Sequence, residues 1–195
     1  MSKYNINKAQ LNNTKKHIRN LLKKCQGEES EKICTKLINT LEYSNIKDKE
    51  KNLWFAYYSR AQSYIIMEKY EKALKDAEKT FYYIGDLNNL NERYTFSLWL
   101  TSNIHSIFGN IYEAVDNYKK LSKYYRELNY VNLRIACLFN VAKLLGNTRR
   151  MENLINIVRN SDKLEKNKTN FSKSQLIIKM ESEIMEVKEK LKNKG

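Results

Sequence analysis

Three aromatic side chains recur at almost equal spacing along the chain and could serve to bind a partner. They stand 41 and 40 residues apart, and each precedes a small residue by three positions: Tyr58 before Ala61, Trp99 before Ser102, and Phe139 before Ala142. Aromatic rings bury a large apolar area at little cost in side-chain entropy, and tyrosine and tryptophan also keep a polar group for hydrogen bonding. The chemistry that these residues offer is association.

Residues that could carry catalysis are few. The two histidines, His17 and His105, have no cysteine or carboxylate at metal-ligand spacing, and the sequence contains no glycine-rich phosphate loop, nucleophile elbow or zinc-binding pair. The cysteines Cys25, Cys34 and Cys137 are odd in number and also lack metal spacing. This pattern favours reduced thiols in a cytoplasmic protein. We therefore expect a protein that is not an enzyme and that uses no cofactor or metal.

The net charge of +14 over 195 residues raises the alternative of a nucleic-acid-binding protein. The excess is spread along the chain, with +6 in residues 1–52, +5 in 53–161 and +3 in 162–195. An AT-rich genome would itself enrich lysine together with asparagine, isoleucine and tyrosine. Three cations share one side of the first predicted helix and could contact phosphate or an acidic protein, or simply face solvent: Lys15, Arg19 and Lys23.

Apolar spacing predicts helices along almost the whole chain. No apolar run is long enough to cross a membrane, and the first residues lack the apolar core of a signal peptide. Glycines at 27, 85, 109 and 146 are expected to end helices, and residues 162–170 read as a polar linker. The predicted helices span about 7–25, 28 to the low forties, 49–67, 70–84, 91–108, 111–128, 130–145, 148–161 and 171–195.

A repeat of about forty residues indicates stacked helical hairpins, each too small to bury its own apolar face. We expect an all-α protein of about nine helices that forms a single domain over 1–195. Within it, residues 1–48 form a diverged N-terminal hairpin, 49–161 form three repeat hairpins, and 171–195 form a C-terminal capping helix. The apolar residues of that last helix follow a three-four spacing that suits either a cap on the final repeat or a homodimer seam: Ile177, Met180, Ile184, Val187 and Leu191.

The repeated residues resemble the tetratricopeptide repeat. The matching positions are Ala61, Tyr64, Tyr70 and Ala73 in the first copy, Ser102, Gly109, Ile111, Ala114 and Tyr118 in the second, and Ala142 in the third. The longer period is similar to that of the bacterial and phage peptide-sensing regulators of the Rap and PlcR group. The first 48 residues are too few for the helix-turn-helix domain of the transcription factors in that group. The family's proline at the repeat boundary is also absent.

This resemblance implies a right-handed solenoid of helical hairpins whose first helices line a concave face. It would align Tyr58, Trp99 and Phe139 in one row, and place Gln62, Asn103 and Lys143 in a parallel row with Asn140 nearby. Rings beside amides suit an extended peptide, because an amide can bond both the donor and the acceptor of its backbone. In the alternative interpretation, the aromatic residues pack between hairpins and the amides face solvent. The predicted function is a regulator, adaptor or inhibitor that binds a protein or peptide.

Overall fold

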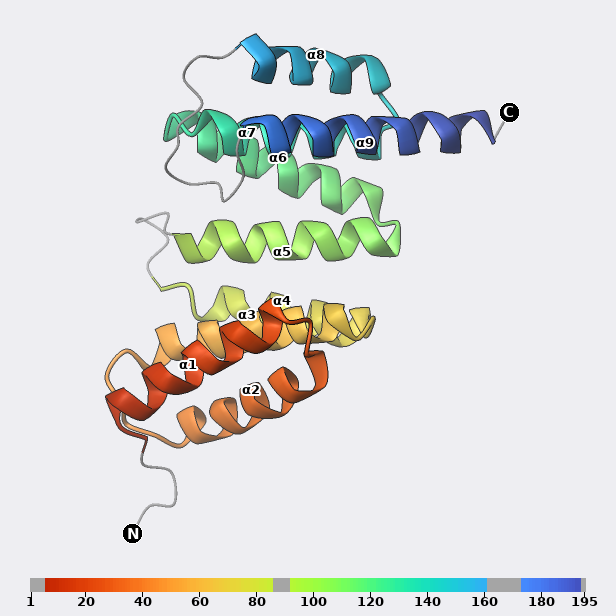
Figure 1. The fold of residues 1–195 in the computed structure, drawn as a ribbon. Helices are drawn as coiled ribbons and strands as arrows, with labels where there is room; N and C mark the ends of the chain where they lie inside the picture. The colour runs from red at the N-terminus through yellow and green to blue at the C-terminus, as the bar shows by residue number, and fades with distance from the viewer. Residues whose placement is uncertain (1–5, 86–91, 161–172, 194–195) are drawn as a thin grey trace. The chain divides into compact units, whose positions relative to one another are not determined.

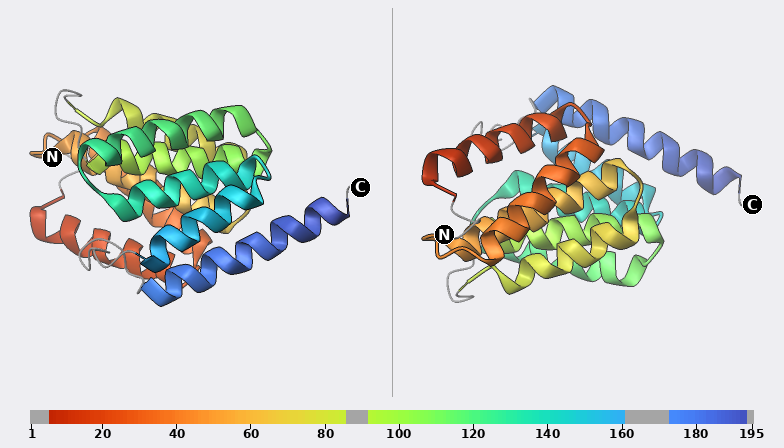
Figure 2. Two further views of the ribbon diagram at one scale, coloured as in Figure 1. Left: turned by 90° about the horizontal axis from the view of Figure 1, so that it is seen from above. Right: turned by 90° about the horizontal axis from the view of Figure 1, so that it is seen from below.

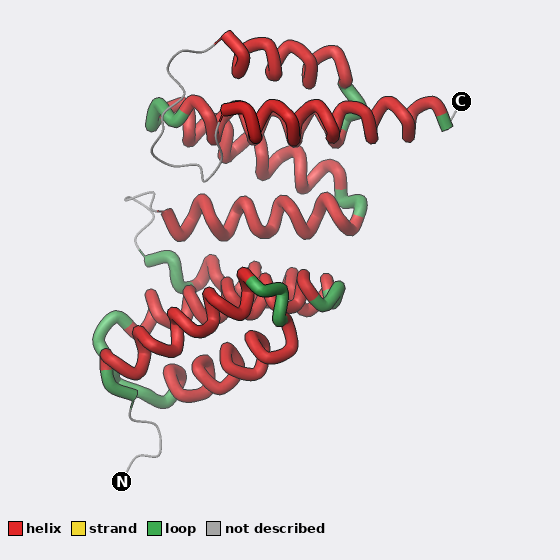
Figure 3. Tube along the Cα trace, viewed as in Figure 1, coloured by secondary structure: helices red, strands yellow, loops and turns green. Residues whose placement is uncertain are grey.

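The computed structural model describes residues 6–85, 92–160 and 173–193. Over these residues the chain consists of α-helices and loops without a strand, which confirms the predicted all-α class (Figures 1 and 3). Each predicted helix is found close to its predicted position, whereas the predicted linker lies outside the described residues. The helices are α1 Lys8–Lys23, α2 Gly27–Glu42, α3 Lys49–Ile66, α4 Tyr70–Tyr82, α5 Glu92–Phe108, α6 Ile111–Glu127, α7 Val131–Leu144, α8 Thr148–Asn160 and α9 Lys173–Lys192.

The internal contacts of the chain group into two compact units, residues 1–108 and 109–195. The boundary falls between α5 and α6, the two helices that the repeat pattern assigns to one hairpin. Helix α5 therefore belongs to the first unit, and α6 belongs to the second.

Helix α3 is at the centre of the first unit. It packs against its chain neighbours α2 and α4, and it also touches α1 and α5. Contacts between alternate helices place α1, α3 and α5 in one layer and α2 and α4 in the other. This alternation of consecutive helices is consistent with the predicted helical solenoid.

The small residues of the repeat are buried at contacts between helices. Ala61 of α3 and Ala73 of α4 are fully buried and share a core with Leu100 and Ile104 of α5. In the second unit, Ala142 is likewise fully buried in the core. The repeat pattern thus records helix packing, because only a small side chain fits at these contacts.

Gly27 has a different role from the predicted one. Helix α1 already ends at Lys23, the residue with left-handed backbone is Cys25, and Gly27 is the first residue of α2. A Cβ atom on Gly27 would lie 3.0 Å from the carbonyl oxygen of Ser63 and 3.0 Å from Ile66 Cγ2. Glycine is required there because α3 passes directly against the start of α2.

Four helices end in the same hydrogen-bonded turn, and three of these turns have no glycine at the left-handed position. Cys25, Glu68 and Asn129 adopt positive φ, as does Gly146. In each turn, the amide that follows the left-handed residue donates to a carbonyl five residues earlier, which satisfies the open end of the helix. These bonds are Gln26 N to Leu21 O at 3.0 Å, Lys69 N to Tyr64 O, Tyr130 N to Tyr125 O and Asn147 N to Ala142 O, the last three at 2.8 Å.

Helix α9 covers the end of the second unit. It lies beside α8 in both Figure 1 and Figure 2 and also touches α7. Met180, Ile184 and Val187 are buried in one core with residues of α7 and α8, and Ile177 packs against that core, whereas Leu191 is exposed. Four of the five apolar residues with this spacing therefore pack against other helices of the same chain, as the capping interpretation expects.

Replacing Gly27 with alanine should lower the free energy of unfolding by about 1–3 kcal/mol, because the added methyl group forces α2 away from α3. Urea unfolding followed by circular dichroism measures the change. A Gly27→Ala protein as stable as the natural chain would show that α2 and α3 are not in such close contact.

Replacing Glu68 with glycine should have the opposite effect. Glycine accepts φ of 57° without steric cost, so the free energy of unfolding should rise by about 0.5–1 kcal/mol. The matched control is Lys69→Gly at the next position, where φ is −92° and the substitution only adds freedom to the unfolded chain. If both variants are equally destabilised, the turn does not require a left-handed residue at position 68.

Candidate partner-binding site

One side of α3 is occupied by an ion pair that joins three helices. The Arg60 guanidinium donates from Nε to Asp76 Oδ2 at 2.6 Å and from Nη2 to Asp76 Oδ1 at 2.9 Å. Its third nitrogen, Nη1, donates to Thr35 Oγ1 of α2 at 3.1 Å. The two charged side chains are only 16% and 7% exposed. Such a two-pronged, charge-assisted contact fixes α3 against both α2 and α4.

Aromatic rings and the Asp76 carboxylate surround the Arg60 guanidinium. Its guanidinium lies 5.3 Å from the ring centre of Tyr57 and 5.9 Å from that of Tyr64. Burial by itself would lower the pKa of Arg60, but the hydrogen bonds and charge of Asp76 outweigh burial and raise it. Glu31 accepts hydrogen bonds from Thr35 at 2.9 Å and from Tyr64 at 3.3 Å. With these internal partners, the side of α3 facing α2 and α4 serves to hold the helices together.

The other side of α3 carries an aromatic platform made of Trp54, Tyr58 and Phe96 of α5. The rings of Trp54 and Tyr58 are stacked, with centroids 5.0 Å apart and planes 18° apart. Phe96 lies 6.4 Å from Trp54 and 6.1 Å from Tyr58, and it is 47% exposed. Helical geometry places Trp54 and Tyr58 roughly opposite Arg60 around α3. The platform offers apolar area on the layer that α3 shares with α5.

A buried hydrogen bond fixes the tryptophan of the platform. Trp54 Nε1 donates to Ser97 Oγ at 3.0 Å, and the Ser97 hydroxyl is 2.6 Å from that of Thr80 in α4. Both hydroxyl residues are fully buried. The hydrogen bond to Ser97 and the stacking on Tyr58 hold the indole ring in one orientation. Binding of a partner to this ring therefore costs less side-chain entropy.

Four of the residues predicted from the sequence belong to the two helices that carry the platform. Tyr58 is part of it, and Gln62 follows one turn later on α3; Trp99 and Asn103 lie three and seven residues after Phe96 on α5. All four are half-buried. Sequence reasoning missed Trp54 and Phe96, although each lies one turn before a predicted aromatic residue and is itself aromatic.

The predicted residues of the second unit are Phe139, Asn140 and Lys143. Phe139 is 4% exposed and lies in the core formed by α7, α8 and α9, so it is a packing residue that a ligand cannot reach. This is the alternative that the sequence left open. Lys143 pairs with Glu183 of α9, its Nζ 2.9 Å from Oε2, so its charge already has a partner within the chain. Asn140 is half-buried.

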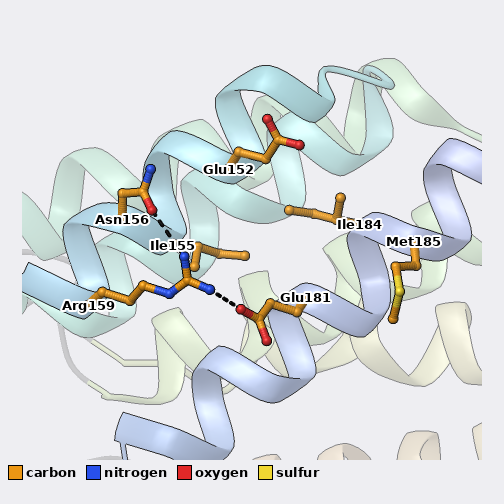
Figure 4. A pocket seen from close by; sticks show the side chains of 7 residues that line it. All are labelled: Glu152, Ile155, Asn156, Arg159, Glu181, Ile184 and Met185. Carbon is orange, nitrogen blue, oxygen red and sulfur yellow. Dashed lines mark hydrogen bonds and ion pairs between the residues drawn. The ribbon is translucent and has the colours of Figure 1, made fainter.

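A groove of about 510 Å³ runs between α8 and α9 of the second unit (Figure 4). Ile155, Ile184 and Met185 contribute apolar surface, while Arg159 is paired with Glu181 and bonded to Asn156. Glu152, the last lining residue, pairs with Lys188. None of the predicted site residues lines this groove, and its charged groups already have partners.

The residues considered for other chemistry are dispersed. Cys25 is an exposed free thiol and Cys34 a buried one, and burial raises the pKa of the Cys34 thiol to about 12. His17 lies 3.8 Å from Glu29 on the surface. Within the described ranges, no cluster of three or more histidine, cysteine, aspartate or glutamate residues could hold a metal, and no helix could span a membrane.

The basic residues of the first helix differ in their surroundings. Lys15 and Arg19 both lie over the ring of Phe55 in α3, whereas Lys23 is exposed at the end of α1.

Comparison of the chain with protein-family models, with curated proteins and with solved structures gives no match.

Replacing Asp76 with asparagine keeps the shape of the side chain but leaves the Arg60 charge half-buried without its anion. The free energy of unfolding should fall by about 3 kcal/mol, at the lower end of the range for breaking a buried pair. Circular dichroism during urea unfolding measures this loss. The matched control, Glu29→Gln, removes an exposed carboxylate of the same unit and should change stability by less than about 0.5 kcal/mol. Equal effects would mean that the ion pair does not hold the unit together.

Proposed function

We propose that this chain is a non-catalytic binding module that captures a protein segment or peptide on the face formed by α3 and α5. The observation that carries the proposal is the aromatic platform, in which Trp54 is anchored from the core and Phe96 is left half exposed. Preformed aromatic surfaces are the usual centres of binding energy in protein interfaces. Gln62 and Asn103, two of the amides predicted from the sequence, lie on the same two helices as the platform.

The architecture supports a tetratricopeptide-like module. Helices in each unit pack in alternation, and the small residues of the repeat, such as Ala61 and Ala142, are buried at helix contacts. In such folds the first helix of each hairpin contributes to the binding face, and α3 and α5 hold those positions in the first unit. A regulator, adaptor or inhibitor in the cytoplasm, acting by occupying another protein, fits this arrangement and requires no cofactor.

The alternative is a nucleic-acid-binding protein that uses its basic surfaces. The position of Lys15 and Arg19 over one aromatic ring favours this candidate. Salt distinguishes the two functions: binding of a polyanion weakens steeply as salt rises because counterions are released, while binding to an apolar platform changes little.

The test is affinity capture from the native cell, followed by mass spectrometry of the retained proteins. The Phe96→Ala chain should retain the specific partner at least about tenfold less well, because Phe96 is the exposed member of the platform. The double variant Trp99→Ala with Asn103→Ala tests the neighbouring predicted residues in the same way. The matched control is Tyr82→Ala, which removes an aromatic side chain that is 82% exposed on α4.

Circular dichroism confirms that each variant is folded. Capture that survives both Phe96→Ala and the double variant would contradict the proposed face. Capture lost equally in Tyr82→Ala would show that surface aromatic residues act without a defined site.

A further inference from the structure

Three cations gather where α1 meets α3, on the layer that also carries the aromatic platform. The Lys15 ammonium donates to Asn52 Oδ1, and Asn52 is only 5% exposed. Lys15 Nζ is 5.3 Å from the ring centre of Phe55, and the Arg19 guanidinium is 5.0 Å from the same centre. Lys51 of α3 is the third cation, and its charge acts on Lys15. Lys15, Arg19 and Lys51 are called the cation cluster below.

At Lys15, the like charges of the cation cluster outweigh the one opposing charge. Burial, followed by the charges of Arg19 and Lys51, lowers the pKa of Lys15, and Asp48 opposes this effect only in part. Like charges close together repel, and here a buried amide and a ring face hold two of them in place. An arriving anion would relieve this repulsion without having to order the side chains first.

The cation cluster and the aromatic platform are linked by residues on one side of α3. Lys51, Trp54 and Tyr58 are spaced three and four residues apart and so lie along one side of α3. Phe55, which carries the other two cations, follows Trp54 directly and turns toward α1. A ligand crossing from α5 to α1 would therefore meet Phe96 first, next the stacked rings, and finally the cations.

We propose that the segment bound on this face is acidic: its carboxylates bind at Lys15, Arg19 and Lys51, and an adjoining large apolar side chain packs on the aromatic platform. This proposal rests on the proposed function and specifies the partner's chemistry. Arginine and lysine bind carboxylates with charge-assisted hydrogen bonds, and opposite charges also speed the encounter.

The geometry favours an acidic peptide over a nucleic acid. Single-stranded nucleic acids need open ring faces for their bases and a track of cations for the phosphates. Here Trp54 and Tyr58 cover each other by stacking, and Phe96 is tilted at 42° and 60° to them. The cations are confined to one end of the surface.

The test uses the full chain and isothermal titration calorimetry with a synthetic peptide of glutamates that contains one phenylalanine. We expect binding that weakens about tenfold or more when the glutamates are replaced by glutamines, and similarly when Lys15, Arg19 and Lys51 are all changed to Gln. The matched control changes the same number of exposed cations elsewhere in the unit: Lys32→Gln, Lys36→Gln and Lys75→Gln. Lys51→Glu alone, at an exposed position, provides a variant that leaves the Asn52 contact intact.

The possible results distinguish the proposal of a binding face on α3 and α5 from the proposal that its ligand is acidic. If Phe96→Ala weakens peptide binding while the cluster variants do not, the acidic assignment is overturned and the proposed face stands. If neither change matters, both proposals fail. Equal losses in the cluster and control variants would show that only net charge acts. Tighter binding of an oligothymidylate, lost in the cluster variants, would overturn the peptide in favour of nucleic acid.

Discussion

The contact between Arg60 and Asp76 is the interaction on which the first unit depends. It fastens the central helix α3 to α4 and, through Thr35, to α2, in surroundings where an unpaired charge would be costly. Because this contact fixes the rotation of α3 about its axis, it also determines what the opposite side of the helix presents. The half-buried rings of Trp54 and Tyr58 and the exposed Lys51 therefore lie on the side of α3 away from this nearly buried ion pair.

Small residues set the distances that this arrangement requires. Gly27, Ala61 and Ala73 stand where helices approach closely, and a larger side chain at any of them would separate the layers. The left-handed turns at Cys25 and Glu68 let each hairpin close within a few residues. Packing and turn geometry together place α1, α3 and α5 side by side, so that cations from one helix and rings from two others can contribute to one surface.

Helices and turns were predictable from the sequence because apolar spacing and turn residues are local signals. The candidate binding surface was less predictable from the sequence. Gly27 was misread because a glycine needed for close approach looks the same as one that ends a helix. Phe139 matches the repeat position of Tyr58, yet it is buried in a core to which α9 contributes, and that burial depends on residues about forty positions away. Lys143 meets Glu183 across a similar separation. Phe96 was overlooked because the repeat alignment selects one aromatic residue per hairpin.

Both tryptophans of the chain, Trp54 and Trp99, belong to the first of its two compact units. Their intrinsic emission therefore reports on that unit alone, whereas the helical signal sums over both. A single sample thus contains an optical probe placed within the candidate surface itself, and comparing the two signals during denaturation distinguishes melting of one half of the protein from melting of the whole.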